Sequence, residues 1–273
     1  MTGVDIRIDA AGIAHLMMTR TGARNALSRD QAARIARAAK ALNDNPAVRV
    51  TVLSSSMPDF FCVGADLKER RTLDERGLME ARRDSTAATQ ALLDLSMPTI
   101  AAVRGMALGG GAELALTCDL IVGDPTTVVG FPETGVGIIP GGGGTQLLPR
   151  KIGNGRAAEM IFTGRRLDAD EAQRYGFLDV LDAADAEAAA LRLATTIASK
   201  SSEAQRNAKS ALRDGQNLPL ADALLCEDRY WRASACSQDY QEGLAAFSEK
   251  RPPVWPAASA APTTEIRHEG ATA

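Results

Sequence analysis

The chain has 273 residues, of which 45% are hydrophobic and 24% are charged, and this is an ordinary composition for a globular protein. A net charge of -3 and a pI near 5.6 give no sign of a nucleic-acid partner. No apolar run approaches the roughly 20 residues that span a bilayer. The first residues, Met1 to Asp5, lack the basic and apolar regions of a signal peptide, so we expect none.

Cysteine and histidine usage narrows the possible chemistry. The four cysteines form no CxxC pair and have no histidine nearby, so a zinc site is not expected and a reducing cytoplasm fits best. These cysteines are Cys62, Cys118, Cys226 and Cys236. His15 lies in a strand-like run and His268 in a polar tail. General acid–base work is therefore expected to fall to carboxylates.

The first third of the chain predicts strands and a capped helix. Residues 4–9 and 12–19 are typical of two short strands. The capping box that begins at Ser28 predicts a helix that ends near Asn43, and the valine-rich run 48–53 predicts a buried strand.

A strand-to-helix turn follows at residues 60–70, with Gly64 just before the predicted helix start. Cys62 in this turn is interpreted as a buried structural thiol, because no base lies near it in the sequence. Residues 72–96 predict a charged, mostly helical segment at the surface, which could cover a cleft.

The chain is organised around a second strand–turn–helix, in which the strand 99–103 feeds the glycine-rich stretch 104–116. Glycines permit positive φ and close approach of a ligand, and the free N–H groups of a helix start favour negative charge. Such a turn can bind a phosphate or stabilise an oxyanion. Glu113 in the first helical turn would repel a phosphate but could move protons beside an oxyanion.

The rest of the core combines short strands with glycine-rich turns, whereas the C-terminal third, from about residue 184, is predicted to be helical. Short strands are predicted at 119–123 and 127–129, and then Pro132-Glu133 leads into four glycines, 141–144, whose backbone must bend tightly or lie against something. Further helices are predicted at 143–150, 154–162, 168–175, 184–199, 202–213, 219–235 and 238–249.

The division of the chain follows from this pattern. A strand–strand–helix unit recurs three times before residue 120, which predicts an α/β coil of such units. We expect a core over 1–183, a helical subdomain over 184–255 and a disordered tail over 256–273.

Four motifs, in this order, resemble those of the crotonase (enoyl-CoA hydratase/isomerase) superfamily. They are Phe61-Cys-Val-Gly-Ala-Asp-Leu-Lys68, Ala107-Leu-Gly-Gly-Gly-Ala-Glu113, Pro132-Glu133 and Ile139-Pro-Gly-Gly-Gly-Gly-Thr145. Residues 138–150 and 249–253 most resemble the AU-binding, methylglutaconyl-CoA hydratase-like branch. The resemblance implies a right-handed ββα superhelix, a C-terminal helical subdomain that serves trimerisation, and a homotrimer or a dimer of trimers.

The resemblance also implies the site residues. It assigns the oxyanion hole to the backbone N–H groups of Ala65 and Gly110, and the acid–base pair to Glu113 and Glu133. It implies a 2-enoyl-CoA substrate with no metal and no cofactor beyond the CoA itself. Substrate-binding residues would be Arg24, Val63, Asp66, Leu67 and Gly141, and the acyl pocket would be lined by Leu73, Leu78, Met79 and Leu92.

The resemblance makes a 2-enoyl-CoA hydratase the leading hypothesis, in which Glu113 and Glu133 add water across the 2,3 double bond. Several alternatives stay open beside it. An enoyl-CoA isomerase would need Glu133 alone as a proton shuttle. Many hydratases of this superfamily carry an orienting glutamine two residues before the second glutamate, although some members of the AU-binding branch lack it. Here that position is Phe131, which leaves the alignment of Glu113 open. A non-catalytic acyl-CoA binder is a third hypothesis. RNA binding is a fourth, and the acidic balance of the chain speaks against it.

Overall fold

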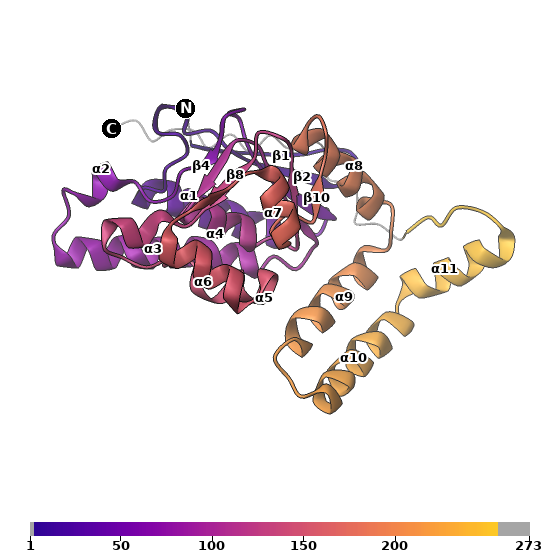
Figure 1. Ribbon diagram of the computed structural model, residues 1–273. Coiled ribbons are helices and arrows are strands. Elements are labelled where there is room, and N and C mark those ends of the chain that lie inside the picture. The colour runs from indigo at the N-terminus through magenta and orange to yellow at the C-terminus, as the bar shows by residue number, and fades with distance from the viewer. Residues whose placement is uncertain (1–2, 256–273) are drawn as a thin grey trace.

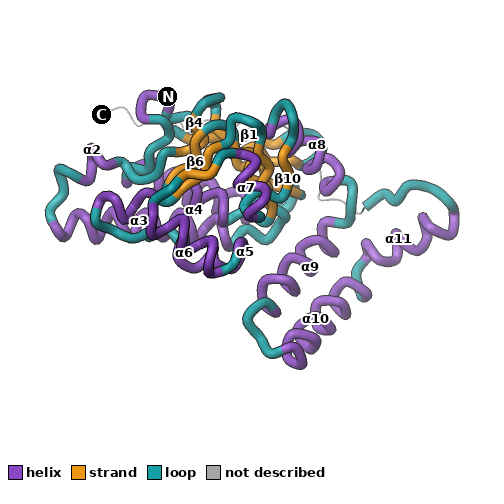
Figure 2. Tube along the Cα trace, in the orientation of Figure 1, coloured by secondary structure: helices purple, strands orange, loops and turns teal. Residues whose placement is uncertain are grey.

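A computed structural model describes residues 3–255, and its strands form two sheets between which the chain alternates (Figures 1 and 2). The six-stranded sheet has the order β1 (Val4–Ile8), β2 (Ile13–Met18), β3 (Val50–Ser55), β5 (Thr99–Val103), β7 (Leu120–Gly123), β10 (Val180–Leu181). The four-stranded sheet has the order β4 (Phe60–Cys62), β6 (Met106–Leu108), β8 (Val128–Gly130), β9 (Arg166–Leu167).

The pairing of the strands explains why the chain winds back and forth between the two sheets. From β2 to β10 all neighbours in the large sheet are parallel, as are β4, β6 and β8 in the small one. Parallel neighbours need crossover connections. The first, from β2 to β3, passes through the helix Arg29–Asn43 alone, whereas those that leave β3, β5 and β7 pass through a small-sheet strand and then a helix. These helices are α2 (Leu67–Arg70) and α3 (Glu75–Leu93) after β4, α4 (Gly110–Leu116) after β6, and the 3-10 helix η2 (Pro132–Val136) after β8.

The helices α1 (Arg29–Asn43) and α3 cover the main core. The side chain of Ser28 accepts the Gln31 N–H at 3.2 Å and so begins α1 at the predicted residue. The other half of the predicted capping box does not form, because the Gln31 side chain donates to the Gly3 carbonyl instead. Ile35 and Leu42 of α1 are fully buried in one cluster with Leu92 of α3. The segment predicted as a surface flap is therefore amphipathic, with one face in the core.

The chain then returns to the sheets through α5 (Gly144–Ile152), α6 (Asn154–Thr163) and α7 (Ala169–Tyr175). The two-residue strands β9 and β10 were not predicted, because two residues are too few to give an alternating pattern. Residues of α8 (Ala186–Ala198), which we assigned to the C-terminal subdomain, pack on the large sheet. Alanines 186, 190 and 194 let this helix lie close to Val50, Val52 and Ile100.

The last three helices, α9 (Ser202–Gly215), α10 (Leu220–Ala235) and α11 (Gln238–Glu249), form an arm that extends away from the sheets (Figure 1). Polar contacts tie its base to the core: Lys209 Nζ lies 2.9 Å from the Met97 carbonyl oxygen and 2.7 Å from Asp119 Oδ2. The tail predicted to be disordered, 256–273, lies outside the described residues. The loop 19–27 carries a short 3-10 turn, η1 (Thr21–Ala23).

Close packing between α4 and β4 generates a testable prediction. A Cβ on Gly111 would lie 2.0 Å from the Cys62 carbonyl oxygen, so Gly111→Ala forces the two elements apart. We expect a loss of about 1–3 kcal/mol in the free energy of unfolding, measured by urea denaturation. The matched control is Gly155→Ala in α6, where a Cβ would meet nothing within 4 Å. It should be neutral or stabilise by about 0.5–1 kcal/mol, and equal losses in both variants would contradict the packing.

Candidate active site

The turns before α2 and α4 lie directly against each other. Gly64 and Gly109 have φ of +88° and +50°, a backbone region that side chains other than glycine rarely adopt. A Cβ on Gly64 would lie 2.7 Å from the Leu108 carbonyl oxygen and 3.2 Å from the Gly110 nitrogen. The absence of side chains thus brings two helix starts together, one from each strand–turn–helix.

Two backbone N–H groups at this junction are held in place without an acceptor. Leu27 N donates to the Gly64 carbonyl at 2.8 Å and Asp66 N donates to the Leu27 carbonyl at 3.1 Å, which fixes the peptides around Ala65. Gly109 N donates to the Gly130 carbonyl at 2.8 Å and so fixes the turn before Gly110. The N–H groups of Ala65 and Gly110 themselves have no acceptor within residues 3–255. They are available to an oxygen of a ligand.

Glu113 is held in place by the four-glycine run. Its side chain is 4% exposed, and Oε1 accepts the N–H groups of Gly142 at 2.7 Å and Gly144 at 2.8 Å. Burial raises the pKa of Glu113, while these two hydrogen bonds oppose the shift by favouring the ionised form. A Cβ on Gly142 would lie 2.7 Å from Glu113 Oε2, so the close approach requires glycine there.

Phe131 stands where many hydratases of the family carry the orienting glutamine, and backbone groups orient Glu113 here instead. Phe131 is fully buried, and its ring packs where a Cβ on Gly144 would lie, at 2.9 Å from Cε1. The backbone N–H groups of Gly142 and Gly144 orient Glu113 without a side-chain amide. Sequence reasoning missed these two donors, although the run of glycines had indicated a backbone that lies against something.

Glu133 reaches the same region from η2. Its Oε1 would lie 2.6 Å from a Cβ on Gly109, which places the carboxylate over the second turn. Burial, together with the negative charge of Glu113, raises the pKa of Glu133 to about 7. Its Oε2 is buried and has no hydrogen-bond partner within the described part of the chain. The two carboxylates therefore have unequal surroundings, since one has two N–H donors and the other has an unpartnered oxygen.

Both glutamates and both N–H groups border one cavity of about 700 Å³. Of the predicted residues, it is lined by Val63, Ala65, Leu67, Leu78, Met79, Gly110, Glu113, Glu133 and Gly141. Further lining residues that sequence reasoning did not single out include Leu27, Arg70, Arg82, Ser85, Thr89 and Gln146. Residues from far apart in the sequence are thus brought to one hollow by the coil of ββα units.

Four predicted residues do not line this cavity. Leu92 is buried in the core, so its prediction as a pocket residue is wrong, and Leu73 also lies outside the lining. Asp66 instead caps α2 through the N–H groups of Lys68 and Glu69 and pairs with Arg20 at 2.8 Å. Arg24 lies over the Phe60 ring, 4.9 Å from its centroid, and its contact with CoA stays a prediction.

Cys62 is a buried structural thiol, as the sequence predicts. Its side chain is fully buried, and its Sγ lies 3.0 Å from the Asn25 carbonyl oxygen. Burial raises the pKa of the Cys62 thiol to about 12, so it stays protonated and does not act as a nucleophile.

The family model described as enoyl-CoA hydratase/isomerase matches residues 9–258. The chain belongs to this family. It is 38% identical over 246 residues to a probable mitochondrial enoyl-CoA hydratase 2 of Arabidopsis thaliana, covering 90% of this chain and 82% of that protein. It is 39% identical to the methylglutaconyl-CoA hydratase of Homo sapiens, covering 89% and 73% of the two chains.

Solved structures agree with this family and with the fold. The crystal structure of an enoyl-CoA hydratase from Bacillus anthracis superposes with a TM-score of 0.90 at 35% identity, covering 93% of this chain and 98% of that one. The crotonase-like fold class expected from the motifs is therefore confirmed. Within residues 3–255, no helix combines the length and the apolar character that crossing a bilayer requires.

Proposed function

We propose that this protein is a 2-enoyl-CoA hydratase, which adds water across the 2,3 double bond of an acyl-CoA thioester. The observation that carries the proposal is the unequal pair of glutamates beside two unused N–H groups in one cavity. Relatives whose names state this reaction, from Arabidopsis thaliana and Homo sapiens, support it.

The proposed reaction follows from the charges that develop. The thioester oxygen accepts the N–H groups of Ala65 and Gly110, which stabilise the negative charge that appears when water attacks carbon 3. Each such donor is worth roughly 3–4 kcal/mol in the transition state. Glu113, whose hydrogen bonds favour the carboxylate, takes a proton from the water. Glu133, whose surroundings favour the protonated form, delivers a proton to carbon 2. No cofactor is required beyond the CoA of the substrate.

The mouth of the cavity suits the CoA moiety. Leu67 is half exposed at the lining, and Val63 lies beside it in the same turn. We infer that CoA lies along the loops that carry Arg24 and residues 63–67. Four free cysteines among the described residues support a reducing compartment such as the cytoplasm.

Isomerisation of a 3-enoyl-CoA is the second candidate. The pKa of Glu133 near 7 suits a group that accepts and returns one proton, which is what double-bond migration requires. A relative from Mycosarcoma maydis, 38% identical, is named an enoyl-CoA isomerase/hydratase. RNA binding has less support, because basic residues of α1 are paired locally, Arg34 with Asp30 and Lys40 with Asp44.

The kinetic test separates the two reactions. Glu113→Gln and Glu133→Gln keep the side-chain size and remove the charge. In a hydratase each should lower kcat for hydration of crotonyl-CoA by about 10²–10⁴. The same proteins are assayed for migration of a 3-enoyl double bond. Near wild-type hydration by Glu113→Gln, or a wild type that only migrates the double bond, would overturn the proposal.

The pH profile tests the assignment of acid and base. Glu133 must be protonated to donate, and its pKa is about 7. The hydration rate should therefore fall as the pH rises through about 7, because the proton to be donated is lost. A rate that instead increases through pH 7 and stays high at pH 9 would make Glu133 the base, as isomerisation requires.

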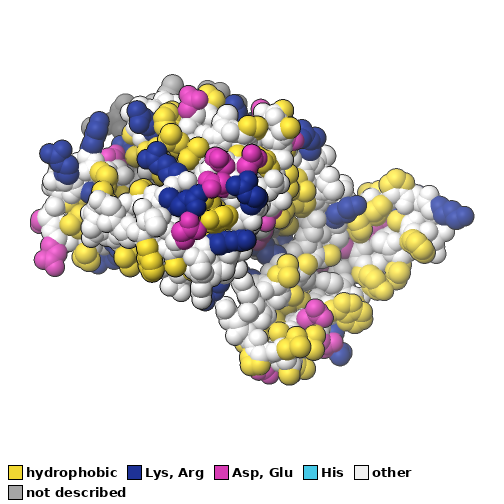
Figure 3. Space-filling view, in the orientation of Figure 1, with side chains coloured by type: hydrophobic (Ala, Val, Ile, Leu, Met, Phe, Trp, Pro, Cys, Tyr) yellow, Lys and Arg dark blue, Asp and Glu magenta, His cyan; other side chains and the backbone are white. Residues whose placement is uncertain are grey.

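We also propose that the arm mediates assembly into a homotrimer or a dimer of trimers. Large apolar side chains lie exposed along it (Figure 3). The most exposed are Leu212, Leu220, Leu225, Trp231 and Phe247, between 65% and 86% accessible. An apolar surface of this kind is typical of a buried interface. Sedimentation equilibrium at micromolar concentration should give three or six chains, and Leu225→Asp should dissociate them. A wild-type monomer would contradict the assembly.

A further inference from the structure

The turn that carries Glu133 makes few packing contacts within the chain. Glu133 lies on the 3-10 helix η2, between Phe131 and Pro140, which are both buried. Residues 134–139 are all exposed, and η2 contains no buried residue. A Cβ on Gly135 would meet nothing within 4 Å, so this glycine does not lie against another element. Packing within the chain therefore does not fix the position of the turn.

A single hydrogen bond attaches this turn to another element. Two backbone bonds, from the N–H groups of Gly137 and Ile138, stay inside the turn. The hydroxyl of Thr134 instead donates to the Ile161 carbonyl of α6 at 2.9 Å. In the described part of the chain it is the one hydrogen bond that joins residues 132–139 to another helix or strand.

The acceptor of this bond lies at a helix end that is fixed by ion pairs. Ile161 lies in the last turn of α6, where carbonyl groups lack the N–H partners of a continuing helix. Arg165, just beyond α6, pairs with Glu159 of α6 at 2.7 Å and with Glu171 of α7 at 2.5 Å. The Thr134 hydroxyl thus binds a carbonyl that is available and held in place.

The bond to α6 also determines where Glu133 points. A 3-10 helix has three residues per turn, so neighbouring side chains diverge by about 120°. With Thr134 directed at α6, Glu133 is directed elsewhere, and its Oε1 would lie 2.6 Å from a Cβ on Gly109. Its Oε2 is buried and has no hydrogen-bond partner among the described residues. The place of this carboxylate therefore depends on the turn that carries it.

We propose that Thr134 is a positioning residue for the reaction: its hydroxyl, bonded to the Ile161 carbonyl, holds η2 so that the Glu133 carboxylate stays over the turn before Gly110. This rests on the proposed function in taking Glu133 as the acid of the reaction. A displacement of about 1 Å in a catalytic site can lower a rate about 10²-fold. Loss of the bond should therefore impair turnover much more than binding.

Kinetics of three variants test the proposal. Thr134→Val keeps the shape of the side chain and removes the hydroxyl. It should lower kcat for hydration of crotonyl-CoA by about 10- to 100-fold and leave KM within about twofold. Thr134→Ser keeps the hydroxyl and should restore most of kcat. Thr195→Val on α8 removes an equivalent bond, to the Leu191 carbonyl at 2.8 Å, outside the cavity lining, and should leave kcat unchanged.

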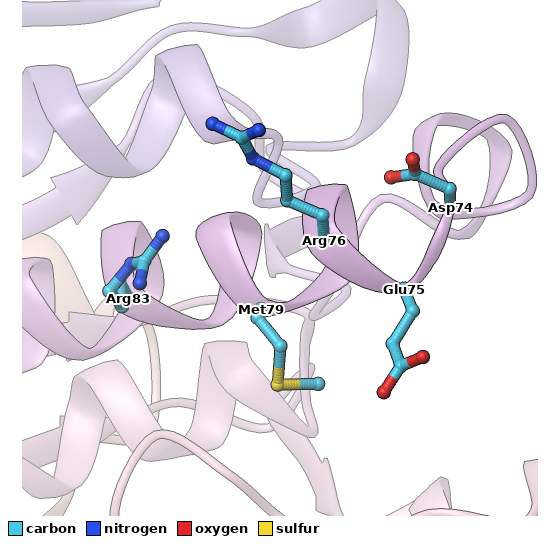
Figure 4. A pocket seen from close by; sticks show the side chains of 5 residues that line it. All are labelled: Asp74, Glu75, Arg76, Met79 and Arg83. Carbon is cyan, nitrogen blue, oxygen red and sulfur yellow. The ribbon is translucent and has the colours of Figure 1, made fainter.

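A second control lies near the opposite wall of the cavity. Asp74 begins α3 by accepting the Gly77 N–H at 2.8 Å. It borders an outer hollow with Glu75, Arg76, Met79 and Arg83 (Figure 4). Asp74→Ala loosens the start of α3 without touching η2, so it should leave both kcat and the titration of Glu133 unchanged.

A measurement without turnover separates this proposal from the proposed function. The Glu133 carboxyl group is titrated by infrared difference spectroscopy, and its band is assigned by its loss in Glu133→Gln. The pKa of about 7 should fall toward 4.5 in Thr134→Val, because a released turn exposes the carboxylate to water and moves it away from Glu113. A protein that hydrates no enoyl-CoA but shows this shift would contradict the hydratase proposal and support the positioning of Glu133 by Thr134.

Three results would overturn the positioning role. One is wild-type turnover, or wild-type titration of Glu133, in Thr134→Val. Another is a Thr134→Ser protein as impaired as Thr134→Val, since the hydroxyl would then not matter. The third is an equal loss of kcat in Thr195→Val or Asp74→Ala, which would assign the effect to a general loss of stability.

Discussion

The contact between the two glycine turns is the constraint on which the rest of the site depends. Gly64 has no room for a side chain between the Leu108 carbonyl and the Gly110 nitrogen, and Gly111 has none against Cys62. Packing of backbone against backbone brings the two helix starts to the border of one cavity. The ββα coil supplies the two turns at equivalent positions, because each follows a strand of the small sheet, β4 in one case and β6 in the other.

The absence of side chains at the glycines also determines the surroundings of the two carboxylates, Glu113 and Glu133. Glu113 can be buried because the glycine run offers it two N–H groups at 2.7 and 2.8 Å, where any side chain at Gly142 would collide. Glu133 has no such donors on its buried oxygen, and its pKa is raised to about 7. Burial raises the pKa of both carboxylates, but the N–H groups of Gly142 and Gly144 oppose that shift at Glu113, while the negative charge of Glu113 adds to it at Glu133. Such a difference is what a reaction needs when one group accepts a proton and the other donates one.

Much of this arrangement was readable from the sequence. Alternating strands, the Ser28 capping box and the alanine-rich helices predicted most elements, and the glycine turns with Glu113 indicated an oxyanion site. What could not be predicted depends on long-range contacts. The N–H groups of Gly142 and Gly144 carry no side-chain signal, and the assignment of Leu92 to the core rather than the cavity depends on which way α3 faces.

The central claim is that the N–H groups of Ala65 and Gly110 converge on the thioester oxygen, and an infrared spectrum tests it most directly. Butyryl-CoA labelled with ¹³C at its thioester carbonyl lets the bound carbonyl stretch be separated from the protein amide bands. Two N–H donors in a partly dry cavity should polarise the carbonyl, so the band should move to lower wavenumber than for the same ligand in water. A bound carbonyl that absorbs at its aqueous wavenumber, or above it, would contradict the account.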